Sequence, residues 1–284
     1  MINSGKLGYI YVVLGVVLYS FSDAIMKNAM DIYSIHQVIF LRSFFRFVPI
    51  LILMFLAKSN PYCSHRKTEN IFRAVLASCG TYCIMMAYKY AAMTDVFVVG
   101  GTTAIFVIPL SVWILGEKFN KMNLLAVILG FSGICLAFRP GSGIFQFGIL
   151  FAVISAIVSA FNQVLIKRLS FTENEFTIIS YHNTCLILIT LILGGNEFHW
   201  VSLMNILILS LGGIIGAFAQ YFITRAFKLS SSSGLASAAY AMLIPNVIID
   251  YLVFNKIPDV YILVGLILIF SGWFIAFKLQ AKLK

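Results

Sequence analysis

Apolar stretches of about 17 to 25 residues recur along the whole of this 284-residue chain, separated mostly by short polar connections. Each is long enough to cross the roughly 30 Å hydrocarbon layer of a bilayer as an α-helix rising about 1.5 Å per residue. Charged side chains make up only 11% of the residues, against about 25% in soluble domains. No soluble core has room for this much apolar surface, so the sequence predicts a polytopic membrane protein.

Hydropathy and polar or Gly/Pro interruptions divide the chain into ten expected transmembrane helices. One connection is long, at 58–70, and the others are short turns. The predicted fold class is therefore all-α, with spans near 7–27, 34–57, 71–89, 94–116, 121–139, 146–167, 174–194, 201–226, 233–254 and 258–278.

The positions of the Lys and Arg residues predict the orientation. With the N-terminus inside, fourteen of the twenty cations fall on the cytoplasmic side and four on the outer side, while Arg42 and Arg46 lie within a span. This bias indicates that both termini are cytoplasmic, because cytoplasmic loops carry the excess of Lys and Arg. A bacterial inner membrane is the expected location.

The net charge of +10 does not predict a nucleic-acid-binding protein. Such proteins gather Lys and Arg in patches on a polar surface, whereas here the cations stand singly at helix ends. The five cysteines form no CxxC motif and no Cys/His spacing suited to zinc. We therefore expect contact with membrane lipid, and no nucleic acid, cofactor or metal.

The chain matches itself at a shift of 139 to 140 residues. The pattern FSGxxxAF occurs at 131–138 and again at 270–277, and AxK at 87–89 recurs at 226–228. The two halves, 1–140 and 141–284, thus each hold five predicted helices. Five is odd, so the second half enters the membrane upside down relative to the first, as an inverted repeat.

Inverted repeats supply two near-equivalent packings that open a midplane site to one side or the other. This favours a secondary transporter of a small solute, with a coupling ion or counter-substrate, acting as a monomer or weak homodimer. A metabolite exporter of unknown specificity is one alternative, and an integral membrane enzyme acting on a lipid-like substrate is another. It calls for an acidic metal-binding pair, a Ser/His or Cys/His set or a phosphate loop, and the sequence has none. A channel or assembly subunit fits the composition but gives no reason for the repeat.

Ionisable residues inside spans are costly and usually have a use. Arg42 and Arg46, four apart, share one helix face and are candidates to present cations to a cavity; ion-pair packing and, for Arg46, snorkelling to the interface are the alternatives. Asp23 lies at a depth that matches Arg42, which predicts a salt bridge between them. That pair is either structural or a switch that substrate binding breaks.

The second half is neutral at the equivalent positions, where Gln163 answers Asp23 and His182 answers Arg42. Amide side chains in membranes often bond neighbouring helices, and a lone His serves either proton coupling or a hydrogen bond. We also consider aromatic walls suited to a planar or cationic solute. The remaining candidates for substrate contact are Tyr82, Tyr88, Gln220, Tyr221 and Asp250.

In the order and spacing of several short motifs, the sequence resembles the EamA-like carriers of the drug/metabolite transporter superfamily. These are Arg42, Arg73, the AYKY stretch at 87–90, the LGE at 115–117 and the GxxG of 130–133 that leads to Pro140. The resemblance implies two five-helix repeats and metabolite transport. One departure is that Thr102-Thr103 replaces the proline usual in the fourth helix.

A second resemblance is narrower. The segments SDAxMK at 22–27 and FLRxFF at 40–45 are similar to those of bacterial S-adenosylmethionine uptake carriers. This resemblance implies S-adenosylmethionine, an amino acid or a related solute as substrate.

Overall fold

The computed structural model describes residues 4–30, 32–56, 60, 62–91, 93–138, 147–242 and 260–282. Helices account for the regular structure of these residues, which confirms the predicted all-α class. The elements are α1 Ser4–Met30, α2 Ile35–Leu56, α3 Lys67–Tyr90, α4 Met93–Gly101, α5 Thr103–Leu115, α6 Lys121–Phe138, α7 Phe147–Leu169, α8 Glu175–Gly194, η2 Gly195–Glu197, α9 Leu203–Leu229, α10 Ser232–Leu235, η3 Ala236–Met242 and α12 Val260–Lys282.

Within the described residues, seven helical segments are long and apolar enough to cross a membrane, so the chain is a multi-pass membrane protein. They coincide with α1, α2, α3, the α4–α5 pair, α7, α8 and α9. Two shorter apolar helices, Lys121–Ala137 and Val260–Gly272, correspond to the predicted fifth and tenth spans. The predicted span 233–254 begins in α10 and η3 and continues outside the described residues. The count of ten spans therefore stays a prediction.

The predicted span 94–116 is divided into two helices at Thr102. The two glycines before it, Gly100 and Gly101, are weak helix formers. The Thr102 hydroxyl donates to the Val99 carbonyl at 2.6 Å, and its backbone N–H donates to the same carbonyl at 3.0 Å. This tight turn separates α4 from α5. At the other end of α5, Gly116 takes a left-handed conformation with φ 66°, which ends the helix.

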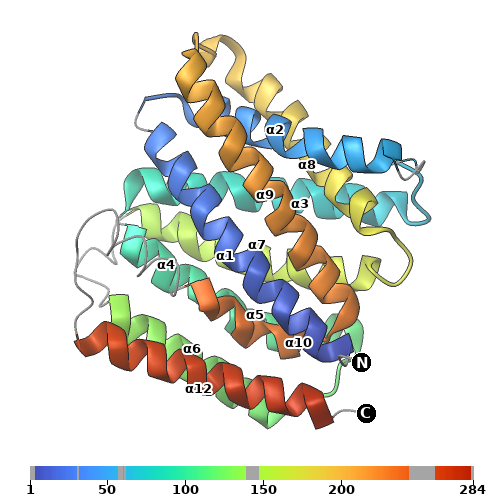
Figure 1. The fold of residues 1–284 in the computed structure, drawn as a ribbon, viewed down its shortest axis with the longest axis vertical. Coiled ribbons are helices and arrows are strands. Elements are labelled where there is room, and N and C mark those ends of the chain that lie inside the picture. Colours follow the sequence, from blue (N-terminus) through green and yellow to red (C-terminus); the bar gives the residue numbers. More distant parts are fainter. Residues whose placement is uncertain are drawn as a thin grey trace.

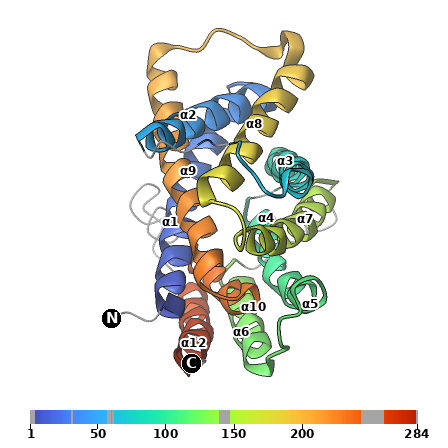
Figure 2. The same cartoon turned by 90° about the vertical axis from the view of Figure 1, so that its right-hand side faces the viewer.

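The helices pack in pairs along the length of the molecule (Figure 1). Helix α2 lies with α8 at one end and α6 with α12 at the other, while α1 packs along α9 and α3 along α7 between them (Figure 2). Helices α6 and α12 approach closely because glycines face each other: a Cβ added at Gly133 would lie 2.6 Å from the Gly265 carbonyl. Both termini lie on the same side of the bundle, at the lower right of Figure 1, where α1 begins and α12 ends.

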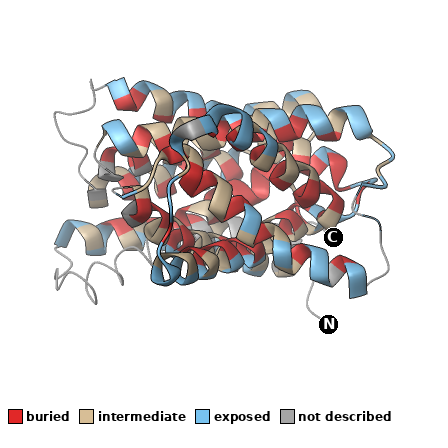
Figure 3. Ribbon diagram, turned by 90° about the horizontal axis from the view of Figure 1, so that it is seen from above, coloured by how far each residue is buried: buried red, intermediate tan, exposed pale blue. Residues whose placement is uncertain are grey.

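Buried residues gather between the helices, and exposed ones cover the outside (Figure 3). Many of the exposed side chains are large and apolar, among them Phe55, Ile192 and Leu203. An apolar exterior is what a bilayer requires of a helical protein. The interior, in contrast, contains buried polar and charged side chains, including Arg42, Arg46 and Arg73.

Candidate functional site

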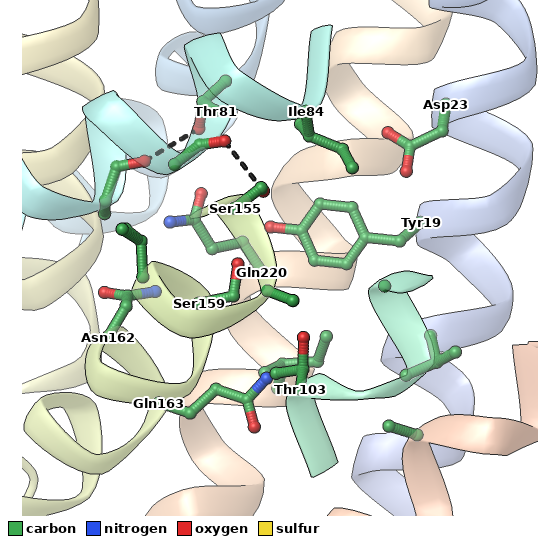
Figure 4. Close-up of a pocket in the computed structure, with 18 of the residues that line it drawn as sticks. Tyr19, Asp23, Thr81, Ile84, Thr103, Ser155, Ser159, Asn162, Gln163 and Gln220 are labelled. Atoms are coloured by element: carbon green, nitrogen blue, oxygen red, sulfur yellow. Dashed lines mark hydrogen bonds between the residues drawn. The ribbon is translucent and has the colours of Figure 1, made fainter. Parts of the chain in front are cut away.

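A cavity of about 380 Å³ lies in the interior of the helix bundle (Figure 4). Its wall is formed by α1, α2, α3, α7, α8 and α9, by the α4–α5 break and by η3. Side chains from α1, such as Tyr19, face side chains from α7, such as Asn162, across it. The polar lining residues are Tyr19, Ser20, Asp23, Arg42, Ser43, Arg46, Thr81, Tyr88, Thr103, Ser155, Ser159, Asn162, Gln163, His182, Gln220, Thr224 and Tyr240.

Asp23 and Arg42 form an ion pair at the cavity wall. Arg42 Nη2 donates to Asp23 Oδ1 at 2.5 Å, and the two side chains are 7% and 24% exposed. The pairing predicted from their matched depths is confirmed. Because Asp23 is the more exposed partner and also lines the cavity, a bound solute has access to the pair.

A second polar chain runs from Arg46 through Gln220 to His182. Arg46 Nη1 donates to Gln220 Oε1 at 3.3 Å, and Gln220 Nε2 lies 3.0 Å from His182 Nδ1. All three side chains are buried. The ring of Tyr19 lies between the two arginines, with its centroid 5.9 Å from Arg42 Cζ and 5.7 Å from Arg46 Cζ, a range in which cations are attracted to aromatic rings.

Seven of the ten candidate residues predicted from the sequence line this cavity. They are Asp23, Arg42, Arg46, Tyr88, Gln163, His182 and Gln220. They come from α1, α2, α3, α7, α8 and α9, so residues far apart in the sequence surround one space. Asp250 lies outside the described residues.

Tyr82 and Tyr221 were also expected at the site, and the structure does not bring them there. On α3 the cavity face includes Thr81 and Met85; Tyr82, about 100° further round the helix from Thr81, forms a hydrogen bond with His36 Nδ1 at 3.2 Å. Tyr221 follows Gln220 in the same way and stacks on Phe176, with ring centroids 5.5 Å apart. Helical phase explains both corrections.

Several lining residues were not singled out as site candidates, notably Tyr19, Thr81, Ser155, Ser159 and Thr103. Single hydroxyl groups in an apolar helix resemble ordinary helix-packing residues, so their sequence signal is weak. Tyr19 had a usable signal, because it lies one helical turn before Asp23 and therefore on the same face.

Arg73 is fully buried beside the cavity and joins three helices. Its Nη1 donates to Asn162 Oδ1 at 3.1 Å, and its Nη2 donates to the Ile178 carbonyl at 2.6 Å. These bonds connect α3 to α7 and α8. Arg73 is thus hydrogen-bonded to a residue of the cavity wall, Asn162.

Helices α5 and α10 are in contact on the side of the bundle where both termini lie (Figure 1). The Glu117 carboxylate accepts hydrogen bonds from the backbone N–H of Ser232 at 2.8 Å and of Ser233 at 3.1 Å, and from the Ser233 hydroxyl at 2.7 Å. The left-handed Gly116 turns the chain so that Glu117 reaches this segment.

The sequence model of the EamA-like transporter family matches this chain twice, over residues 6–139 and 146–278. The S-adenosylmethionine uptake transporter of Rickettsia prowazekii (strain Madrid E) is 23% identical over 252 residues, which cover 89% of this chain and 86% of that protein. The pseudopaline exporter CntI of Pseudomonas aeruginosa is 24% identical, with 93% of each chain covered.

A solved crystal structure shares the fold, with a TM-score of 0.81, 14% sequence identity and 98% of each chain covered. Members of the family are named as transporters, which points away from an enzyme. Because the two matched segments together cover most of its length, the chain belongs to the EamA-like transporter family.

Proposed function

We propose that this protein is a secondary active transporter that carries a small metabolite across the inner membrane by alternating access. The solute binds in the central cavity, and the two repeats, 1–140 and 141–284, rearrange to open the cavity to one side and then the other. The two separate matches to the family model, 6–139 and 146–278, support this division of the chain.

One observation carries the proposal: equivalent positions of the two halves line the same cavity. Twenty of the 34 lining residues form pairs in one register of the sequence repeat, 140 residues apart for positions in the first two helices and 139 apart for positions in the third and fourth. Chance does not explain why lining positions of the two halves match in the repeat across so many helices. The pairs are Val16/Ala156, Tyr19/Ser159, Asp23/Gln163, Arg42/His182, Arg46/Leu186, Thr81/Gln220, Ile84/Ile223, Met85/Thr224, Gly100/Ala239 and Gly101/Tyr240.

Helix packing supports an inverted repeat in the same way. If α1, α2, α3 and α6 correspond to α7, α8, α9 and α12, then the contact of α1 with α9 corresponds to that of α7 with α3, and both occur. A Cβ at Gly133 would lie 2.6 Å from the Gly265 carbonyl, and one at Gly272 would lie 2.6 Å from the Ala126 carbonyl. These two close approaches are the same contact seen from each half.

The location of the termini supports cytoplasmic ends for the chain. They lie on one side of the bundle (Figure 1), which is where an even number of spans, such as the ten predicted, would put them. The fourteen-to-four distribution of Lys and Arg then assigns that side to the cytoplasm.

For the solute we propose S-adenosylmethionine or a related amino-acid-like molecule. The cavity of about 380 Å³ is at the lower end of the roughly 300–1,000 Å³ typical of ligand sites, which suits a single small metabolite. The polar lining offers an acid, two arginines and several hydroxyl groups, which match a zwitterionic head. One relative, which aligns with this chain over 86% of its own length, is named as an S-adenosylmethionine uptake transporter.

The test is transport by the purified protein in proteoliposomes. Radiolabelled S-adenosylmethionine is supplied outside vesicles that are empty or preloaded with the unlabelled compound, with a proton gradient imposed in either direction. Saturable uptake that unlabelled substrate accelerates from the opposite side is expected of an alternating-access carrier. Because one relative is named as an exporter, efflux from loaded vesicles is measured as well.

The matched control is the same assay on vesicles that contain the Gly130→Leu variant. The leucine side chain would overlap the Tyr240 ring, so we expect this variant to be inactive. Flux that rises linearly with concentration and is unaffected by preloading would indicate a channel and contradict the proposal. Chemical conversion of the substrate during the assay would indicate an enzyme.

A further inference from the structure

Arg46 is a buried cation of the cavity that no described acid neutralises. Its exposed fraction is 4%. Among the described residues, its Nε has no hydrogen-bond partner, and its one hydrogen bond is the 3.3 Å bond to the neutral Gln220. Asp23 is the acid among the described lining residues, and Arg42 already holds it at 2.5 Å. The described cavity wall thus contains two arginines and one carboxylate, which leaves a formal charge of +1.

His182 adds a second donor with no partner. Since Gln220 Oε1 accepts from Arg46, the amide nitrogen of Gln220 is free to donate to His182 Nδ1, 3.0 Å away. A His whose Nδ1 accepts a hydrogen bond carries its proton on Nε2. His182 Nε2 is buried and has no partner among the described residues. Two unsatisfied donors therefore belong to one hydrogen-bonded chain at the cavity.

Buried polar groups without partners are unfavourable, and a buried unpaired charge is more so. Such a site gains most from a ligand that brings a single negative charge and acceptor oxygens. A carboxylate meets both needs, because its two oxygens accept parallel hydrogen bonds from one guanidinium. A phosphate dianion would leave the cavity with an excess negative charge.

We infer that Arg46, supported by His182 through Gln220, is the binding site for a carboxylate of the transported solute, while Arg42 remains paired with Asp23. This inference rests on the proposed carrier function and names the chemical group that the carrier recognises. Of the two arginines predicted as candidates, it places the carboxylate on Arg46, one helical turn from Arg42.

The first test compares acids with their carboxylate-free counterparts by thermal stabilisation of the purified protein in detergent, since ligands that bind the folded state raise its stability. The probe pairs are S-adenosylmethionine and decarboxylated S-adenosylmethionine, L-lysine and cadaverine, and L-methionine and L-methioninamide. For at least one pair, we expect the acid to bind wild type about 10- to 100-fold more tightly, the range for a charged hydrogen-bonded contact.

The Arg46→Gln variant should lose this preference, and Arg46→Lys should lose most of it, because an ammonium does not reproduce the two parallel bonds. Arg66→Gln is the matched control, since Arg66 is a half-exposed arginine that pairs with Glu69 away from the cavity. It should keep the wild-type preference.

A second test needs no ligand. Gln220→Glu places a carboxylate beside Arg46, so it should raise the thermal midpoint of the empty protein and abolish acid binding. Gln163→Glu is the same substitution at another lining position, where the described contacts do not include Arg46, and it should not raise the midpoint. Asp250 is a predicted site residue that lies outside the described residues, and it is an acid. Both variants are therefore also measured in an Asp250→Asn background, in which this carboxylate is absent.

The inference is wrong if no acid stabilises the wild type, if Arg46→Gln keeps the preference for acids, or if Gln220→Glu is no more stable than Gln163→Glu. These outcomes are distinct from failure of the proposed function. Acid binding that depends on Arg46, without any flux in proteoliposomes, would support the site and refute the carrier.

Discussion

Removing the charge of Asp23 should destabilise the protein more than the partial exposure of its side chain suggests. Asp23→Asn leaves the Arg42 guanidinium, 7% exposed, without the carboxylate that now lies 2.5 Å away. Removing one partner of a buried pair costs about 3–5 kcal/mol. Asp23 is itself 24% exposed, and the Asn amide oxygen still accepts a hydrogen bond, so we expect a loss of about 2 kcal/mol, below the range for fully buried pairs.

The double change Asp23→Asn with Arg42→Gln should recover most of this loss. It removes both charges, and replacement of a whole buried pair by neutral groups is often close to neutral. For a chain of this size, about 2 kcal/mol corresponds to a thermal midpoint lowered by roughly 4–8 °C. The measurement is the unfolding midpoint in detergent, followed by intrinsic fluorescence, for wild type and each variant.

The pair of Arg168 and Glu69 provides the control. Their atoms lie 3.4 Å apart, but the side chains are 44% and 36% exposed, so Arg168→Gln should change stability by less than about 1 kcal/mol. If Asp23→Asn lowers the midpoint no more than Arg168→Gln does, the ion pair does not stabilise the fold and the reasoning fails. Transport separates the remaining roles: restored flux in the double variant indicates a structural pair, and lost flux indicates a part in the transport cycle.

Three further predictions use single positions with matched controls. Gly130→Ala should destabilise the protein by about 1–3 kcal/mol in chemical denaturation, because the added Cβ overlaps the Tyr240 ring, whereas Gly100→Ala, which meets no atom within 4 Å, should not. Glu117→Gln should lower the free energy of unfolding by about 1–2 kcal/mol, seen as a lower thermal midpoint, through weaker capping of the Ser232–Ser233 N–H groups, while Lys118→Gln next to it should change little. A cysteine placed at Tyr62 in a cysteine-free background should resist an impermeant maleimide in intact cells, and one at Tyr90 should react, since 58–70 is predicted inside and 89–94 outside; the reverse labelling would invert the orientation.

Hydropathy predicted the helices well because a membrane helix must be apolar along its whole length. It failed where structure changes within an apolar stretch. The Thr102 break is a tight turn in which the Thr102 hydroxyl and backbone N–H both bond the Val99 carbonyl, inside a run that stays apolar from Val96 to Leu115 apart from small residues. Likewise, the stretch after Ser231 forms the short α10 and the 3₁₀ segment η3 in place of one continuous helix start.

The sequence predicted the charged residues of the candidate site. It did not predict which way each helix turns its side chains or which residues form pairs. Asp23, Arg42 and Arg46 stand out because charges within spans are rare, and the repeat pointed to Gln163 and His182. Tyr82 and Tyr221 were misplaced because residue type and depth do not fix the rotation of a helix about its axis. Which arginine is paired and which is free depends on contacts from α1 and α9, and these do not appear in the local sequence.

Among the described lining residues, the charged side chains all belong to the first half, although equivalent positions of both halves line the cavity. Asp23, Arg42 and Arg46 in α1 and α2 are matched by Gln163, His182 and Leu186 in α7 and α8. In the proposed carrier, the exchange between two open states depends on helix packing being alike in the two halves, and small residues such as Gly133 and Gly272 preserve that likeness. Recognition of one solute has the opposite requirement, since a molecule with no two-fold symmetry needs different groups on its two sides. Divergence is therefore expected among the polar lining residues while the packing contacts stay paired, and this is the distribution that the two halves have.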